Sequence, residues 1–402
     1  MRTVAEAMLD RAVGWRQGVV ARVSAVPLTL ADVPVPGFAA VPEPFVTGGT
    51  SGGAGPGARQ AAIAEALERH AAACCPLESV VPAATDLRWP LGSFTLHSAR
   101  QRSSPGFRYA AGYRDVRYAR AWTLPDNQPV WVPAGLVGLA ATHGLPATSS
   151  GLAAGSSPAR ALLRATQELV ERDAFTVTWL HGLPARQVPL PAELSTPVAE
   201  LGGRVTAFDL TPAYSPHPVA AVAGTLPLAG RQRPTLGLAC RASWADAVHK
   251  AWLEWCQGTV FVSVWLANNP DRRLTPAQVT DFDTHAAYYA GHPDDWHRLP
   301  LWSGQITRPS PDSPSQGPAA QLTELVSTLH GNGVRLAYRE LTTPEPRAVG
   351  LHVMRVLSPD LTPLHADHRW PHLGGRTADV RWRYPWAPAR SSFPSAHPHP
   401  LG

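Results

Sequence analysis

Lysine is nearly absent from this 402-residue chain, since Lys250 is the only one and every other cationic side chain is arginine. A Walker-type phosphate loop ends in Gly-Lys-Ser/Thr, so a nucleotide site of that kind is excluded. Charge is sparse as well, at 16% of residues, whereas 44% are hydrophobic. The chain therefore has enough apolar material for a large packed core, and a wholly disordered protein is excluded.

Cysteine is also scarce, and the spacing of Cys74, Cys75, Cys240 and Cys256 fits neither a zinc site nor a disulfide framework. We expect four reduced core residues. Long hydrophobic runs are missing, because prolines and glycines interrupt the longest uncharged stretch, 127–159. The N-terminal residues carry charges every few positions and lack the apolar core of a signal peptide. No membrane span is predicted, and the expected location is the cytoplasm.

The basic residues give a formal net charge of +5 and an isoelectric point near 9.3. They are scattered along the chain, and no basic run is interleaved with aromatic residues. Nucleic-acid binding is therefore not predicted. A mild preference for anionic partners is all that this charge indicates.

Three strongly helical segments stand out along the chain. The first, ARQAAIAEALERHAAACC, follows the glycine-rich run GGTSGGAGPG. The second follows Ser157 and Pro158, a pair typical of a helix start, and the third follows Ser243. Between the first two helices, RYARAWTL and PVWVPAGLV are separated by PDNQ, which predicts a two-stranded hairpin.

We expect one large domain with a segment on either side. Residues 1–45 begin with a helical pattern and then become rich in valine and proline, which predicts a loop-prone N-terminal segment. Residues 46–385 contain the helical and β-prone segments and are predicted to form one α/β (α+β) domain. Residues 386–402 are a proline-spaced tail that cannot form a helix or a central strand.

Two of the predicted helices share the pattern Glu-x-x-Glu-Arg-x-Ala, in AEALERHA and QELVERDA. Glutamates three residues apart lie on one face of a helix, here Glu65 with Glu68 and Glu168 with Glu171. A single motif of this kind is most often a solvated face with local Glu–Arg pairs. Two copies in helices rich in alanine, leucine and valine weaken that interpretation.

Four carboxylates that converge from two buried helices could not all stay ionised without cations. A bound divalent metal, with Mg²⁺ bridging to nucleotide phosphates, is the simplest arrangement. The third helix adds Lys250, Glu254 and Gln257 at positions i, i+4 and i+7, again on one face. Taken alone, this trio is more often a surface ion pair. Beside the other two helices, it indicates a phosphate-binding cation, a carboxylate and an amide.

These motifs, in this order, resemble the YcaO superfamily, and specifically its SagD-like branch of azoline-forming peptide cyclodehydratases. The similarity covers most of the chain and rests on SGGAGPGARQAAIAEALERHA, TSSGLAAGSSPARALLRATQELVERDAFTVTWL, HKAWLEWCQ, DTHAAYYA, GLHVMRVLSPDLTPLHADHRWPHLGG and HPHPLG. The resemblance implies a YcaO-type fold, with mixed sheets and three motif helices around a site for ATP and Mg²⁺. It assigns the metal to Glu65, Glu68, Glu168 and Glu171. The nucleotide would contact these and also Arg69, Ser156, Arg172, Lys250, Glu254 and Gln257.

The reaction that the resemblance implies starts when a Cys, Ser or Thr side chain of a ribosomal precursor peptide adds to the preceding amide carbonyl. Hydroxide leaves poorly, so ATP converts the amide oxygen into phosphate, and its loss leaves a thiazoline or oxazoline. Family members end in a proline-spaced tail that reaches the active site, which makes Pro398, Pro400 and Gly402 predicted catalytic residues.

The implied setting is the maturation of a thiazole/oxazole-modified peptide of the bacteriocin kind. The chain contains no recognisable leader-peptide recognition domain, so the resemblance implies a separate ThiF-like partner that binds the leader. Oxidation to the azole would need a flavin-dependent dehydrogenase. Whether the chain forms a homodimer is left open by the sequence.

The chain departs from the family pattern at several motif positions. The family often has lysine where this chain has Ala54, serine near Ala61, asparagine and glutamate at Ser156 and Arg160, and arginine at Lys250. Arg160 reverses a charge beside the proposed metal site, which predicts altered nucleotide affinity or magnesium dependence. The alternative function is therefore a degenerate paralogue that binds peptide or acts as a scaffold without hydrolysing ATP. Thioamide formation is a third reading, disfavoured by HPHPLG.

Two further patterns have simpler explanations. Residues 49–53 fit G-x-S-x-G, but Pro44 makes the preceding segment a poor central strand, so we expect a glycine-rich turn and not a hydrolase nucleophile. The segment LHADHRWPH contains residue types that bind metals but no helix to align them, which predicts a surface loop. The residues concerned are His365, Asp367, His368 and His372.

Overall fold

The computed structural model describes residues 4–14, 19–25, 37–42, 49–52, 56–114, 116–139, 144–146, 148–270, 272–308, 316–388 and 393–402. Its helices are α1 (Val4–Asp10), α2 (Pro56–Cys74), α3 (Ala99–Arg102), α4 (Ala110–Arg114), α5 (Pro158–Leu180), α6 (Ala192–Glu200), α7 (Trp244–Asn268), α8 (Phe282–Gly291), α9 (Pro293–Trp296), α10 (Pro318–Gly331), α11 (Pro344–Ala348) and α12 (Val380–Arg383). Its strands are β1 (Val20–Ala25), β2 (Gly37–Pro42), β3 (Gly49–Gly52), β4 (Tyr118–Leu124), β5 (Pro129–Pro133), β6 (Leu152–Gly155), β7 (Arg186–Val188), β8 (Arg204–Asp209), β9 (Val219–Leu228), β10 (Arg231–Cys240), β11 (Leu336–Glu340) and β12 (His352–Leu357).

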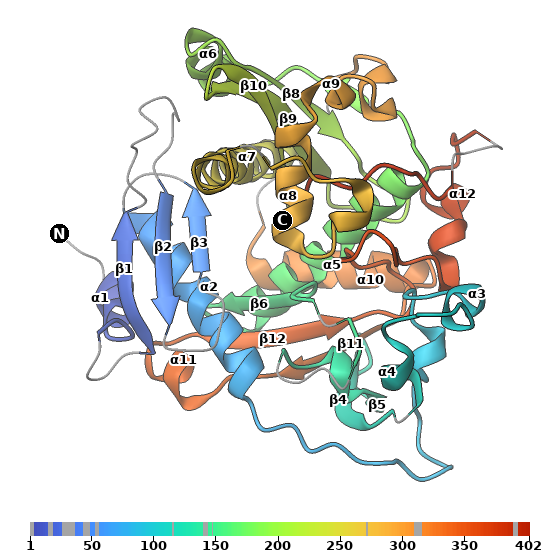
Figure 1. Ribbon diagram of the computed structural model, residues 1–402. Coiled ribbons are helices and arrows are strands. Elements are labelled where there is room, and N and C mark those ends of the chain that lie inside the picture. Colours follow the sequence, from blue (N-terminus) through green and yellow to red (C-terminus); the bar gives the residue numbers. More distant parts are fainter. Residues whose placement is uncertain are drawn as a thin grey trace.

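The strands form three sheets, in the orders β1-β2-β3, β10-β9-β8-β7 and β5-β4-β11-β12-β6 (Figure 1). Every pair of these strands is antiparallel. The predicted α/β (α+β) class is confirmed, but the finer expectation of mixed sheets needs correction. In the described part of the chain, parallel pairing is confined to isolated bridges such as Gln187 with Ile306.

The starts of two motif helices follow from local sequence. The Ser157 side chain accepts a hydrogen bond from the Arg160 N–H, and Pro158 occupies the first turn of α5. The Ser243 side chain accepts one from the Asp246 N–H at the start of α7. The three predicted helices and the β4–β5 hairpin are therefore confirmed.

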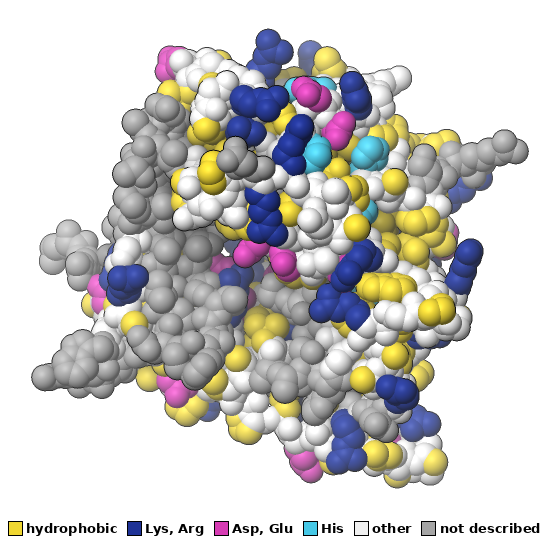
Figure 2. Space-filling model, viewed as in Figure 1, with side chains coloured by type: hydrophobic (Ala, Val, Ile, Leu, Met, Phe, Trp, Pro, Cys, Tyr) yellow, Lys and Arg dark blue, Asp and Glu magenta, His cyan; other side chains and the backbone are white. Residues whose placement is uncertain are grey.

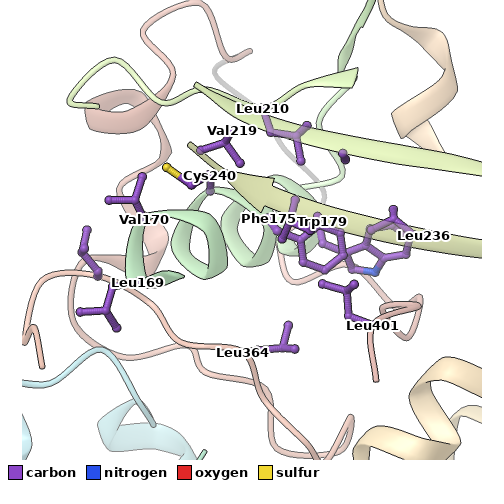
Figure 3. Close-up of a cluster of buried hydrophobic side chains, with 14 of the residues drawn as sticks. Leu169, Val170, Phe175, Trp179, Leu210, Val219, Leu236, Cys240, Leu364 and Leu401 are labelled. Carbon is purple, nitrogen blue, oxygen red and sulfur yellow. The ribbon is translucent and has the colours of Figure 1, made fainter. Parts of the chain in front are cut away.

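The motif helices are held by different sheets. α2 packs against the N-terminal sheet and β6, α5 against β6 and β12, and α7 against β9 and β10. α5 runs through the main hydrophobic core, where Val170, Phe175 and Trp179 are buried (Figure 3). α7 approaches β10 so closely that a Cβ on Gly237 would lie 2.0 Å from the Ala251 carbonyl oxygen. These contacts fix the three polar helix faces relative to one another.

The N-terminal region differs from the sequence prediction. The segment expected to be loop-prone contains β1 and β2, and β3 occupies Gly49–Gly52, where a glycine-rich turn was expected. Each strand gains its hydrogen bonds from the next strand along the chain, and this pairing overrides local composition. Ala54 lies outside the described residues.

The cysteines are free, as expected, but they are not all in the core. Cys240 and Cys256 are buried, whereas Cys74 is exposed and Cys75 half-buried at the end of α2. Cys74 and Cys75 are more exposed than the other two cysteines because the C-terminal end of α2 faces solvent. Among the described helices, none has the combination of length and apolar character that would let it cross a membrane.

Candidate functional site

The glutamate of α2 that faces α5 is Glu68. Its Oε2 accepts a hydrogen bond from the Ala154 N–H of β6 at 2.6 Å. Burial raises the pKa of Glu68 well above its usual range, and the nearby carboxylates of Glu168 and Glu65 raise it further. Glu68 thus couples electrostatically to α5.

The two glutamates of α5 flank one cation. Arg172 Nε lies 3.7 Å from Glu168 Oε1, and Arg172 Nη2 lies 3.7 Å from Glu171 Oε1. Glu171 Oε2 accepts a hydrogen bond from the Cys240 N–H at 2.9 Å, which links α5 to the end of β10. Burial raises the pKa of Glu168 to about 8, and it also raises that of Glu171, although Arg172 opposes both shifts. One arginine therefore does not neutralise this pair.

α7 contributes an ion pair to the same region. Lys250 Nζ lies 3.2 Å from Glu254 Oε1, and Glu254 Oε2 accepts a bond of 3.4 Å from the Leu238 N–H. Burial opposes ionisation of Glu254, but Lys250, Arg172 and Arg241 outweigh it and lower its pKa. Glu254 in turn raises the pKa values of both glutamates on α5. Figure 2 shows acidic and basic side chains at a hollow near the centre of this face, where the motif helices approach one another in Figure 1.

The predicted site residues do not all converge. Those that interact across α2, α5 and α7 are Glu68, Glu168, Glu171, Arg172, Lys250 and Glu254. Glu65 pairs with Arg69 at 2.7 Å and couples to the others through Glu68. Gln257 is half-buried one turn further along α7. Ser156 and Arg160 are exposed at the start of α5.

These carboxylates suit a hard divalent cation. Mg²⁺ binds oxygen ligands, usually one or two protein carboxylates with waters and phosphates. Among the described residues, no three of these carboxylates each place an oxygen within 4.8 Å of the other two, so pairs of ligands fit better than a closed cage. Burial is the main cause of the raised pKa values of Glu68 and Glu168, and a divalent ion would favour the ionised carboxylates. The donor set therefore fits magnesium.

A sequence model of the YcaO cyclodehydratases, described as ATP- and Mg²⁺-binding, matches residues 51–362. The chain belongs to the YcaO family. ATP and Mg²⁺ are the cofactors of this family, as the sequence predicted. A comparison with curated proteins gave no match.

Several solved structures share the fold of this chain. A heterocyclase in complex with substrate and cofactor superposes with a TM-score of 0.77 at 19% identity, over 99% of this chain and 57% of that one. YcaO from Methanopyrus kandleri, bound with AMPPCP and Mg²⁺, gives 0.65 at 18% identity over 91% of each chain. The E. coli microcin synthetase McbBCD complex with pro-MccB17 bound gives 0.62 at 16% identity, over 87% and 89%. This chain spans 57% of the first heterocyclase and 50% of the heterocyclase TruD.

One buried arginine of this YcaO site was missed by the sequence analysis. Arg355 on β12 is 1% exposed and donates hydrogen bonds to the carbonyls of Val137, Thr148 and Ser150. Burial lowers its pKa to about 10, while Glu168 and Glu68 raise it, so the guanidinium group faces both glutamate helices. A lone arginine inside the apolar strand HVMRVL is the signal that could have revealed it.

A second set of cations lies beside the first turns of α5 and α7. Burial lowers the pKa of Arg164 to about 9, and the positive charges of Arg241 and Arg160 lower it further. Arg164 Nη1 donates to Gln167 and Arg241 Nη1 to the Cys240 carbonyl, which are both neutral groups. Arg160, which departs from the family pattern, is thus one of three neighbouring arginines.

The proline-spaced tail ends near the motif helices. It passes α5 and α8, and the C-terminal end lies near the centre of the molecule in Figure 1. Pro398 and Pro400 are buried, whereas Gly402 is exposed beside Ala286 of α8. The pKa of His399 is lowered by burial, by two neighbouring histidines and by Arg172. The ring of His399 therefore lies close enough to interact electrostatically with Arg172 of α5.

The segment LHADHRWPH is not the surface loop that the sequence predicted. His365, Asp367 and His372 are buried, and His368 is half-buried. The reason is tertiary, because His285 of α8 and His399 of the tail pack against His365. Ring nitrogens of these three residues lie within 4.8 Å of one another.

Proposed function

We propose that this chain is an ATP-dependent cyclodehydratase of the SagD-like kind, which converts Cys, Ser or Thr of a ribosomal precursor peptide into thiazoline or oxazoline. One observation carries the proposal. Half-buried Glu68 and Glu168 and buried Glu171 interact across α2 and α5 and have raised pKa values, in a chain of the YcaO cyclodehydratase family. Such a site is incomplete as protein alone and complete with magnesium and phosphate.

The four predicted ligands of Mg²⁺ are Glu65, Glu68, Glu168 and Glu171. Two of them already have one oxygen fixed by a backbone N–H, from Ala154 for Glu68 and from Cys240 for Glu171, which orients the other oxygen. When bound, magnesium-ATP supplies the phosphoryl group that turns the amide oxygen into a leaving group. Because burial raises the pKa of Glu168 to about 8 and that of Glu171 to about 7, binding the metal there should release protons near neutral pH.

The cations of the site have separate tasks in this proposal. Arg172 stays charged between Glu168 and Glu171, and their charges raise its pKa despite burial. It therefore holds the carboxylates apart and presents positive charge to developing negative charge. Lys250 is 36% exposed in its side chain, so it can turn from Glu254 towards a phosphate. Arg69, Ser156 and Gln257 would line the nucleotide further out.

The tail and the partners complete the proposal. Pro398, Pro400 and Gly402 would lie beside the reacting peptide and exclude water, since their segment is packed between α5 and α8. A ThiF-like protein would deliver the precursor by its leader, and a flavin-dependent dehydrogenase would follow. The matched McbBCD complex is a microcin synthetase with pro-MccB17 bound, which is consistent with a peptide substrate for this fold.

One observation favours a second function, a non-catalytic scaffold that binds the precursor. Arg160 joins Arg164 and Arg241 at the side of the site, where the charges of Arg160 and Arg241 lower the pKa of Arg164. Three neighbouring arginines favour an anion held directly by arginine.

Calorimetric titration with ATP and Mg²⁺ tests the assignment. We expect micromolar binding by the unaltered chain and at least tenfold weaker binding by Glu171→Gln, which removes one charge and keeps the shape. Glu193→Gln is the matched control, because Glu193 is exposed on α6. Unchanged affinity in both Glu68→Gln and Glu171→Gln would refute the site. A folded chain that binds no nucleotide but does bind the precursor would support the scaffold.

The reaction itself is tested with the precursor, the leader-binding partner and magnesium-ATP. Mass spectrometry should detect loss of one water for each azoline, together with phosphate release. Binding of nucleotide without loss of water from any Cys-, Ser- or Thr-containing precursor would contradict the cyclodehydratase assignment and leave the nucleotide site intact.

A further inference from the structure

Three buried histidines from distant parts of the chain meet in one cluster. His285 lies on α8, His365 lies in the segment after β12, and His399 lies in the tail. Each of them is at most 2% exposed. Among the described residues, they are the one group of three metal-binding side chains whose ligand atoms all lie within 4.8 Å of one another. The fold therefore assembles a set of residue types that bind metal ions.

The cluster has more ring nitrogens than hydrogen bonds. Within the described part of the chain, His285 Nε2, His399 Nδ1 and both ring nitrogens of His365 are buried without a hydrogen-bond partner. Buried polar atoms of native proteins nearly always have a partner, so several unpartnered nitrogens in one place need an explanation. The protein itself does not supply these partners, which points to a bound species between the three rings.

Two hydrogen bonds show which nitrogens can bind that species. His285 Nδ1 donates to the His399 carbonyl at 2.9 Å, and His399 Nε2 donates to the His365 carbonyl at 2.8 Å. A ring nitrogen that donates to a carbonyl carries the proton of a neutral imidazole, so the opposite nitrogen has a free lone pair. Burial lowers the pKa of His285 to about 3 and that of His399 well below its usual range, which favours the neutral rings.

The same two bonds are typical of metal sites. A histidine that binds a metal through one ring nitrogen usually donates the other ring N–H to a carboxylate or a backbone carbonyl, and this bond orients the ring. His285 and His399 both have such a carbonyl behind the unpartnered nitrogen. The outer contacts of a metal site are thus present for two of the three histidines.

We propose that His285 Nε2, His399 Nδ1 and one ring nitrogen of His365 bind a zinc ion. Three imidazoles with a fourth position for water are an established ligand set for tetrahedral zinc. Magnesium prefers oxygen ligands and would not select this cluster. The inference goes beyond the proposed function, because it gives the chain a second metal site, formed by nitrogen ligands and separate from the glutamates.

The ring orientations define what must move when zinc binds. The His285 and His399 rings are stacked, with centroids 3.6 Å apart and 6° between their planes. An imidazole binds a metal in the plane of its ring, so one of these rings must tilt. Zinc–nitrogen bonds of about 2.0–2.1 Å also bring tetrahedral ligand atoms to roughly 3.4 Å from one another. Zinc should therefore break the stack and contract the cluster.

Zinc binding is measured on the untagged full chain, after a chelator has been added and then removed. With excess Mg²⁺ present, added Zn²⁺ should bind at one ion per chain in metal analysis and should raise the melting temperature. Co²⁺ in its place should give the visible absorption of a tetrahedral ion with nitrogen ligands. A folded chain that binds less than one zinc ion would overturn the site.

Matched variants test the ligands. His365→Phe removes one ligand and fills its space, and no ring hydrogen bond is lost. Zinc affinity should fall on the order of a hundredfold, while the protein without zinc stays folded. His399→Phe keeps an aromatic ring beside His285 and should have the same effect. His330→Phe, exposed on α10, is the control. Equal zinc affinity in His365→Phe and the unaltered chain would refute the assignment.

Surface thiols are the competing zinc ligands on this chain. Cys74 Sγ lies 3.8 Å from His70 Nδ1 at the end of α2, and Cys75 is the next residue. The double variant Cys74→Ser with Cys75→Ser should retain its zinc, because the proposed site contains no sulfur. Loss of zinc from this variant would place the ion at the thiols and overturn the histidine site.

The zinc site and the proposed function can fail independently. Zinc is titrated without ATP or precursor, so the result does not depend on catalysis. Glu171→Gln should lose magnesium-ATP binding and keep its zinc, whereas His365→Phe should keep magnesium-ATP affinity within about twofold. Loss of zinc from Glu171→Gln would assign the ion to the glutamates and overturn the histidine site, while the nucleotide site would stand.

Discussion

Glu168 offers a sharp test of the electrostatics, because removing its charge should stabilise the empty protein. Burial raises its pKa from an ordinary value of 4.5 to about 8. Between these values the folded chain binds more protons than the unfolded chain, so stability falls as the pH rises through this window. Glu168→Gln has no such proton to lose, and its stability should lack this part of the pH dependence.

The size of the effect follows from about 1.4 kcal/mol per pKa unit. Near pH 7 the ionisable side chain costs about 3 kcal/mol relative to glutamine, and above pH 8 on the order of 5 kcal/mol. For a chain of this length, 1 kcal/mol corresponds to roughly 2 °C in Tm. Glu168→Gln without nucleotide should therefore melt several degrees above the unaltered chain.

Thermal melting from about pH 5 to about pH 8, with and without magnesium-ATP, is the assay. The ligand should stabilise the unaltered chain most, because binding favours the ionised carboxylate, and it should stabilise Glu168→Gln far less. The difference between the two melting temperatures should thus become smaller, or change sign, when ligand is added. Glu193→Gln, on the exposed face of α6, should follow the unaltered chain throughout.

Two results would refute this reasoning. One is a melting temperature of Glu168→Gln that equals or falls below that of the unaltered chain at about pH 8 without ligand. The other is an identical pH slope for the two proteins. Either result would mean that burial does not disfavour the ionised form of Glu168 in the empty site.

Two further predictions concern the frame around the site. Asp173 accepts two hydrogen bonds, of 2.7 and 2.8 Å, from Arg383, and both side chains are fully buried. Asp173→Asn should therefore lower the unfolding free energy, measured by denaturant titration, by about 3–5 kcal/mol. A loss below about 1 kcal/mol would contradict the importance of the pair. Gly237→Ala should abolish soluble folded protein in an expression assay, because its Cβ would overlap the Ala251 carbonyl, whereas Gly258→Ala meets only ordinary contacts and is the control. Normal expression of both variants would show that α7 can move away from β10 without loss of folded protein.

Much of the site could be predicted because its signals are local. Ser157 and Ser243 cap their helices through residues three positions on, and glutamates spaced by three share a helix face in any helix. The resemblance to the YcaO family added the cofactors, which the family match confirms. The specific reaction, the tail's role and the partners stay predictions.

Other features depend on contacts between separate segments. β1 and β2 form because β2 pairs with β1 on one side and with β3 on the other, although the composition of β1 and β2 indicates loop. His365 is buried because α8 and the tail cover it. Arg355 lies near Glu68 and Glu168 because β12 packs against α5 and α2. No sequence pattern over a few neighbouring residues predicts these contacts.

The sequence by itself determined where the motif helices begin, which polar residues share a face, and which family and cofactors follow. Only the tertiary structure decided that Glu68, Glu168 and Glu171 lie together, half-buried or buried, with raised pKa values, and that a proline-spaced tail meets four side-chain donors. The physical reason is range. Helix caps and periodicity act over a few residues, whereas desolvation and charge coupling arise when segments a hundred or more residues apart exclude water together.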